Sequence, residues 1–97
     1  MQTYILLMKL TEQGIKDIKN APKRLELATQ SLEAIGGKMI GFYAVMGEYD
    51  YVVIGEVPSD EVGMRFLLGL GVLGNVRTTT LTAFTREEFV RIVEKMP

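Results

Sequence analysis

The amino-acid sequence predicts one small α+β domain, and three observations support this prediction. The chain has 97 residues, of which 47% are hydrophobic and 24% charged, as is usual for a single globular domain. Stretches dense in β-favouring residues alternate with stretches in which apolar residues recur at helical spacing. Glycine, proline and acidic residues stand at the boundaries between these stretches. We therefore treat residues 1–97 as one domain without an internal linker.

The first half of the chain predicts a strand, a helix and a second strand. Residues 3–10 are rich in β-favouring and large apolar side chains, and residues 11–14 indicate a turn or a short helical turn. Pro22 stands where the first turn of a helix tolerates proline, and apolar residues then recur at helical spacing until a pair of glycines ends the helix. Residues 38–46 follow as the second strand.

The second half predicts a third strand, a helix and a fourth strand. Residues 49–57 follow the second strand after only Gly47 and Glu48, which suits a two-residue type II′ turn. Pro58 breaks the strand before a second helix, and residues 76–84 predict the fourth strand. Two βαβ units joined by a hairpin are typical of a ferredoxin-like split βαβ fold.

A terminal helix is predicted after the fourth strand. Thr85 begins the sequence Thr-Arg-Glu-Glu, a capping-box pattern that opens a helix. Apolar residues recur on one side of this helix. We expect four of them to point inward: Phe89, Ile92, Val93 and Met96.

The predicted strands are apolar on both faces of the sheet. Residues 5–8 and 51–54 do not alternate between apolar and polar, as they would in a sheet with one face in water. Helices can cover one face, so the other face needs a second cover. We expect a second copy of the chain, giving a homodimeric α/β barrel, because twofold dimers are the commonest oligomers. The alternative is that the terminal helix folds across this face within one chain.

Composition excludes several classes of function. The sequence has no histidine and no cysteine, which excludes histidine-dependent triads, disulfides, cysteine nucleophiles and the common zinc sites. Its net charge is −1 and its basic residues are scattered, so nucleic-acid binding is not indicated. No apolar stretch approaches the ~20 residues of a membrane-spanning helix. We expect a cytoplasmic protein without a cofactor.

The turn at residues 47–50 is the strongest local candidate for a ligand site. Asp50 stands at a strand start, where aspartate is depleted, so its carboxylate needs donors or a charge partner. It either contacts a ligand or accepts hydrogen bonds from backbone amides and anchors the hairpin, and turn chemistry favours the second role. Neighbouring tyrosines either offer hydroxyls to a ligand or pack in the core.

Arg77 is the only arginine within a predicted strand. Its guanidinium suits an anion, the carboxylate of a ligand or an ion pair across a dimer. We expect Asp50 and Arg77 at opposite ends of the sheet, without a direct ion pair within one chain. The residues predicted to contact a ligand are Tyr43, Gly47, Tyr49, Asp50, Tyr51 and Arg77.

Four short motifs resemble the GYD-domain family of small bacterial and archaeal proteins. They are residues 11–14, 47–50, 74–78 and 82–84, and their order extends over nearly the whole chain. The resemblance implies a dimeric α/β barrel of ferredoxin-like topology and implies no reaction.

A second, more distant resemblance concerns residues 47–80. This segment is similar to the effector-binding domain of the leucine-responsive (feast/famine) regulators, which bind amino acids at subunit interfaces. Those regulators carry an N-terminal helix-turn-helix, whereas this chain begins at the first strand. The resemblance therefore implies a stand-alone small-molecule sensing module, with the turn at 47–50 near the ligand.

Three functions stay open at this point. The leading hypothesis is a homo-oligomeric, non-enzymatic domain that binds an amino acid or a small carboxylate for regulation. The second is a cofactor-independent enzyme, such as a monooxygenase or isomerase, with Asp50 or a tyrosine handling the proton. The third is a structural or protein-interaction module, which would lack a closed pocket between the helices and the sheet.

Overall fold

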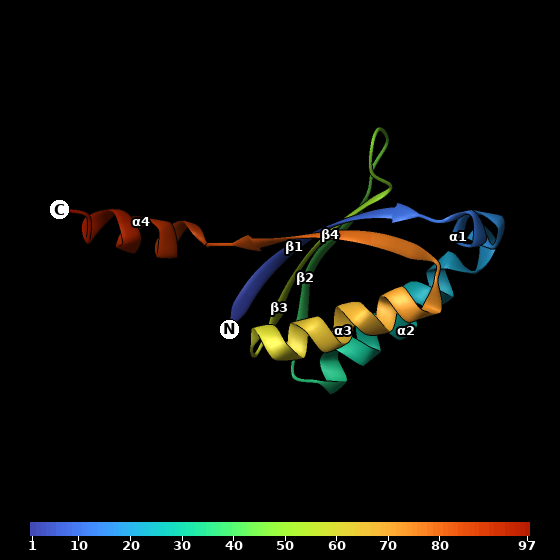
Figure 1. Cartoon of the computed structure of the whole chain (residues 1–97), viewed down its shortest axis with the longest axis horizontal. Helices are drawn as coiled ribbons and strands as arrows, with labels where there is room; N and C mark the ends of the chain where they lie inside the picture. The colour runs from blue at the N-terminus through green and yellow to red at the C-terminus, as the bar shows by residue number, and fades with distance from the viewer.

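The computed structural model describes residues 1–97 and contains one antiparallel sheet with two helices on one of its faces (Figure 1). The strands are β1 (Gln2–Leu10), β2 (Lys38–Ala44), β3 (Tyr51–Val57) and β4 (Val76–Ala83). The helices are α1 (Glu12–Lys16), η1 (Ile18–Asn20), α2 (Ala21–Ala34), α3 (Asp60–Leu73) and α4 (Arg86–Glu94). The strand order is β2-β3-β1-β4, which is the ferredoxin-like fold expected from the sequence.

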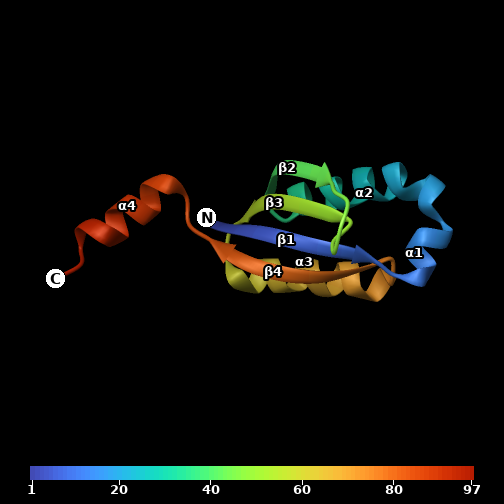
Figure 2. The ribbon, with the colours of Figure 1, turned by 90° about the horizontal axis from the view of Figure 1, so that it is seen from above.

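The central strand, β1, pairs antiparallel with β3 on one side and with β4 on the other. Its alternate residues Tyr4, Leu6 and Met8 are buried beneath the helices. Both α2 and α3 lie on this side of the sheet (Figure 2). Leu32 of α2 is buried with them, and the interior is small: only 9 of 97 residues are buried.

The opposite face of the sheet carries apolar side chains that no helix of the chain covers. We call this surface the open face; Ile5, Leu7, Val52 and Ile54 on it are partly exposed, and Leu81 is 45% exposed. The register pairs Ile5 with Ile54 and Leu7 with Val52, so these residues form one continuous apolar surface. The expectation that the strands are apolar on both faces is confirmed.

Helix α4 extends away from the rest of the domain (Figures 1 and 2). Its predicted capping box is present: Thr85 Oγ1 accepts from the Glu88 N–H (3.1 Å), and the Glu88 carboxylate accepts from the Thr85 N–H (2.8 Å). These hydrogen bonds hold the pKa of Glu88 below its usual value. The helix therefore begins where the sequence predicts.

The predicted direction of α4 is wrong. Its apolar side chains do not point inward, because Phe89 is 60% exposed, Ile92 47%, Val93 46% and Met96 66%. The alternative that α4 folds across the second face of its own sheet is wrong as well. Thr85 has an extended backbone (φ −64°, ψ 165°), and the chain continues outward from β4 without a reversal.

The predicted two-residue hairpin turn is also wrong. Strand β2 ends at Ala44 and β3 begins at Tyr51, so residues 45–50 form a longer connection. Gly47 has a positive φ of 118°, and the Val45 N–H donates to the Asp50 carbonyl at 2.9 Å. This loop stands on the side of the sheet away from α2 and α3 (Figure 1).

None of the helices combines the length and the apolar composition that crossing a membrane requires. The longest, α2 and α3, have 14 residues each.

Substitution of Gly63 tests how closely α3 lies on β1. A Cβ at Gly63 would lie 2.5 Å from Cε2 of Tyr4, whereas a Cβ at Gly69 on the same helix would meet nothing within 4 Å. We expect Gly63→Ala to lower the free energy of unfolding by about 1–3 kcal/mol through overpacking. The control, Gly69→Ala, should raise it by about 0.5–1 kcal/mol through helix propensity. Urea denaturation measures both, and equal effects would contradict this packing.

Candidate functional site

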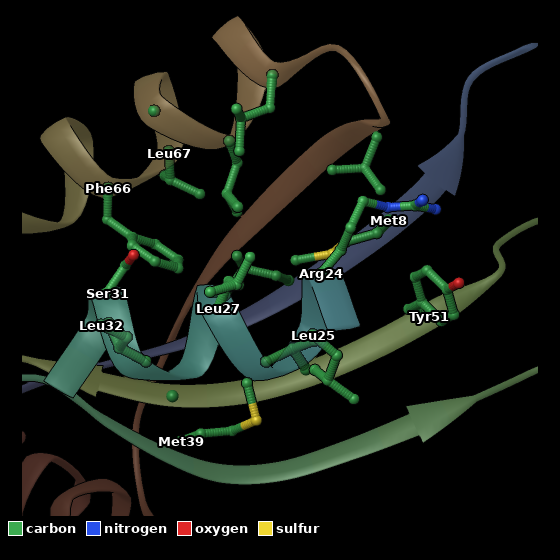
Figure 3. A pocket seen from close by; sticks show the side chains of 18 of the residues that line it. Met8, Arg24, Leu25, Leu27, Ser31, Leu32, Met39, Tyr51, Phe66 and Leu67 are labelled. Carbon is green, nitrogen blue, oxygen red and sulfur yellow. The ribbon is translucent and has the colours of Figure 1, made fainter. Parts of the chain in front are cut away.

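A cavity of about 800 Å³ lies between α2, α3 and the sheet (Figure 3). Of its 28 lining residues, 20 are hydrophobic, and they come from all four strands and both helices. Large apolar side chains such as Leu27, Phe66 and Leu67 line it from the two helices. The cavity is therefore an apolar space between the helices and the sheet, and it is open to solvent, since its lining residue Leu27 is 51% exposed.

Small residues on the two helices explain why this space stays open. Ala28 and Ser31 of α2 line the cavity, as does Gly69 of α3, where a Cβ would meet nothing within 4 Å. These residues present little side chain across the gap, so the helices do not interdigitate as they would in a closely packed pair. The cavity follows from residue size at a few helix positions.

Two arginines are the only charged residues that line the cavity. The Arg24 guanidinium donates to the Asp17 carbonyl (2.8 Å), to the Asp17 carboxylate (3.1 Å) and to the Gly14 carbonyl (3.2 Å). Arg65 of α3 is exposed and forms no hydrogen bond or ion pair within the chain. The charge of Arg24 is thus compensated, and the charge of Arg65 is not.

Tyr4 connects one end of the cavity to α3. Its hydroxyl donates to the Asp60 carboxylate at the start of that helix. This hydrogen bond, together with burial of the ring and the negative charge of Asp60, raises the pKa of Tyr4 to about 12. The Tyr4 hydroxyl is therefore occupied, whereas Ser31 and Tyr51, whose hydroxyls have no partner in the chain, also line the cavity.

The end of β1 is bound by Asp50. The Asp50 carboxylate accepts from the Leu10 N–H at 2.8 Å, and the Asp50 N–H donates to the Met8 carbonyl at 2.8 Å. The hypothesis that Asp50 accepts from a backbone amide and anchors the hairpin agrees with this geometry. Its partner amide lies on β1 rather than within the turn.

The segment after β1 is bound by the connection between α3 and β4. The Thr11 N–H donates to the Asn75 carbonyl (3.0 Å), and the Thr11 hydroxyl donates to the Gly74 carbonyl (2.6 Å). The Gln13 side-chain amide donates to Asn75 Oδ1 at 2.9 Å. A Cβ on Gly14 would overlap the Asn75 carbonyl oxygen, so this contact requires glycine. Three of the four motifs noted in the sequence thus meet at one end of β1.

Residues 4–93 match the model of the GYD domain. The chain belongs to the GYD-domain family. A relative in Thermus thermophilus is described as a glutamine synthetase and cystathionine beta-lyase binding protein. The two are 36% identical over 84 residues, which is 86% of this chain and 88% of the relative.

A solved structure shares the fold of this GYD domain. It is a feast or famine regulatory protein from M. tuberculosis complexed with L-methionine, with a TM-score of 0.66 and 21% sequence identity. The match covers 88% of this chain and 51% of that protein, so the GYD domain corresponds to about half of the regulator.

Five of the six residues predicted to contact a ligand lie outside the cavity. Tyr51 lines the cavity and packs on Phe42, with ring centroids 5.1 Å apart. Tyr43 belongs to the open face and is 61% exposed. The Lys9 ammonium lies 5.5 Å from the ring centroid of Tyr49, outside the cavity. Of the predicted set, the structure brings only Tyr51 to the cavity.

The expected separation of Asp50 and Arg77 is wrong. Asp50 precedes β3 next to Met8, and Arg77 pairs with Lys9 at the start of β4, so both lie at the same end of the sheet. The reason is topological: β3 and β4 both run antiparallel to β1, so both begin where β1 ends. Strand β1 separates the two residues, and no ion pair joins them, as expected.

Sequence reasoning missed the cavity and its two arginines. Arg24 and Arg65 stand on helices among apolar residues, where an arginine is normally read as part of the solvated side. The useful signal was the presence of small residues among the large apolar residues of both helices: Ala28 on α2 and Gly69 on α3.

Substitution of Asp50 tests its role at the end of β1. We expect Asp50→Ala to lower the free energy of unfolding by about 1–3 kcal/mol, because the Leu10 N–H loses its acceptor. Asp50→Asn keeps an oxygen acceptor and should lose clearly less. Glu48→Ala, in the same loop but with a side chain 74% exposed, should change stability by less than about 0.5 kcal/mol. Chemical denaturation would refute the role if the alanine and asparagine variants were equally stable.

Proposed function

We propose that this GYD domain is a regulatory module that binds a small molecule in the cavity between α2, α3 and the sheet. The cavity carries the proposal. Its volume of about 800 Å³ and its apolar lining with a few polar groups are those of a small-molecule site. The Thermus thermophilus relative is described as binding two enzymes, and a regulator that shares the fold holds methionine. Both support a binding or regulatory role, and the first also supports a protein partner.

Exposed apolar side chains in the cavity favour an occupant. The cavity is open to solvent, because its lining residues Leu27 and Leu73 are 51% and 65% exposed. Water therefore fills the space when no ligand is bound. An apolar ligand would cover lining side chains that otherwise face water, which is favourable by about 25 cal/mol per Å².

The positions of the candidate acids and bases favour binding over catalysis. No aspartate or glutamate lines the cavity. Asp50 lies outside it and accepts from the Leu10 N–H, and the Tyr4 hydroxyl is bonded to Asp60. Of the tyrosines at the cavity, Tyr4 is already bonded to Asp60, and Tyr51 has a free hydroxyl but no carboxylate that lines the cavity with it. An enzyme at this site would therefore have to rely on Tyr51 alone.

The predicted ligand contacts enter this proposal in two ways. Tyr51 belongs to the proposed site because it lines the cavity. A second site between subunits, for an amino acid or a small carboxylate, stays a prediction, and so does a cytoplasmic location. The remaining residues assigned to that second site are Tyr43, Gly47, Tyr49, Asp50 and Arg77.

The module acts, in this proposal, as a homodimer that pairs through the open face. This face presents a continuous apolar surface, and a twofold axis allows it to meet an identical surface on a second copy. Burying such a surface is favourable by about 25 cal/mol per Å². A domain of 97 residues, with few buried residues of its own, gains much from this burial.

A cavity-filling variant tests the ligand site. The uncharged fluorescent probe N-phenyl-1-naphthylamine should bind the unmodified chain saturably, with one site per chain. Ala28→Leu places three more carbons in the cavity and should weaken this binding by at least tenfold, whereas Ala34→Leu, on the same helix outside the cavity, should leave it unchanged. Absence of saturable binding, or equal binding by the two variants, would exclude the site.

A charged substitution on the open face tests the dimer. We expect light scattering after size exclusion to give twice the 10.8 kDa of one chain. Leu7→Glu should reduce the mass to that of one chain, because a carboxylate cannot be buried between two apolar faces without a partner. Leu68→Glu, at an exposed position of α3 outside the cavity, is the matched control and should stay dimeric. A monomeric unmodified chain would disprove the dimer.

A further inference from the structure

We infer that the ligand of the cavity is an amphipathic anion, with an apolar body inside the cavity and an acid group at Arg65. This inference rests on the proposed function, since it takes the cavity to be the ligand site. It goes further by naming the chemical class that the lining residues accept and the class that they reject.

The charges of the lining residues are the first argument. Arg24 and Arg65 are both cationic, and the lining contains no aspartate, glutamate or lysine. Arg24 already has its counterion, because its guanidinium lies 3.1 Å from the Asp17 carboxylate. Arg65 is therefore the one charged group at the cavity that lacks a counterion within the chain. An acid group on the ligand supplies that counterion, in a geometry that guanidinium favours.

The position of Arg65 is the second argument. It lines the cavity and is also exposed, so it stands where the cavity meets solvent. A ligand whose acid group stays at this rim keeps its charge partly hydrated while its apolar part lies among Leu27, Phe66 and Leu67. Such a molecule is amphipathic by necessity, because a fully polar molecule would leave the apolar lining uncovered.

The scarcity of acceptors is the third argument, and it concerns free amino acids. A buried ammonium group needs acceptors or a negative charge. Among the side chains that line the cavity, the uncommitted hydroxyls are those of Ser31 and Tyr51, while the Asn75 amide oxygen already accepts from Gln13. The cavity therefore disfavours the zwitterion of an amino acid such as the methionine bound by the structurally similar regulator.

The length of the lined segment sets the size of the apolar body. Lining residues on α3 extend from Gly63 to Leu73, which is about 15 Å of helix and suits a tail of about ten carbons. Decanoate, decanol and decylammonium are therefore suitable probes, since they share one tail and differ in the charge of the head group.

Calorimetric titration of the full chain with the three probes tests the inference. We expect decanoate to bind about fivefold more tightly than decanol, because an exposed ion pair contributes little more than this. Decanoate should bind about tenfold or more tightly than decylammonium, whose charge is repelled by Arg65. High salt should reduce this preference. Arg65→Gln should equalise decanoate and decanol, whereas Arg86→Gln, which removes an arginine from α4 outside the cavity, should keep the preference.

The outcomes separate this inference from the proposed function. If all three probes bind equally, if decylammonium binds best, or if Arg65→Gln keeps the preference for decanoate, the anionic class is wrong and the cavity remains a ligand site. If none of the three probes binds, the inference and the proposed function fail together.

Discussion

The hydrogen bonds at the end of β1 determine how the other elements of this GYD domain are arranged. The Leu10 N–H donates to the Asp50 carboxylate, and the next residue, Thr11, donates its N–H to the Asn75 carbonyl. These bonds stop β1 at a defined residue and bring the residues just before β3 and β4 to its two sides. Because β1 is the central strand, the position of both neighbouring strands depends on this point. Gly14 completes it, since any larger residue would push the Asn75 carbonyl away.

Further polar contacts fix the ends of the two helices. Arg24 binds the start of α2 to Asp17 and Gly14, while Gln13 binds Asn75, just after the end of α3. At its other end, α3 is held by the hydrogen bond between Tyr4 and Asp60. Helix α2 is thus fixed by polar bonds at its start and α3 at both of its ends, and small residues on the two helices line the cavity between them. This arrangement leaves the helices and the sheet without close packing at the cavity. Departures from close packing are expected at functional sites.

The sequence predicted the elements well because each depends on local signals, such as the capping box at Thr85 and the glycine pair after α2. The failures were non-local. The turn after β2 is longer than two residues because Asp50 bonds to β1 instead of closing a tight hairpin. The amphipathic pattern of α4 predicts that its apolar side will be covered, but the pattern is the same whether its own sheet or another molecule covers it. Periodicity marks the cavity residues as core, since a side chain that faces a cavity and one that faces a packed interior recur at the same spacing.

This arrangement explains why membership of the GYD-domain family indicates a fold more readily than a ligand. The motifs through which the sequence resembles the family, at residues 11–14, 47–50 and 74–78, supply the bonds that fix β1 and its neighbours. The charged group that the cavity presents to a ligand, Arg65, lies outside all of these motifs. Because Arg65 is exposed and forms no hydrogen bond or ion pair with the rest of the chain, replacing it changes the charge of the cavity at little cost to the fold. A single framework can in this way carry cavities of different charge, and the cavity lining, more than the motifs, is where differences in ligand between members of the family should be sought.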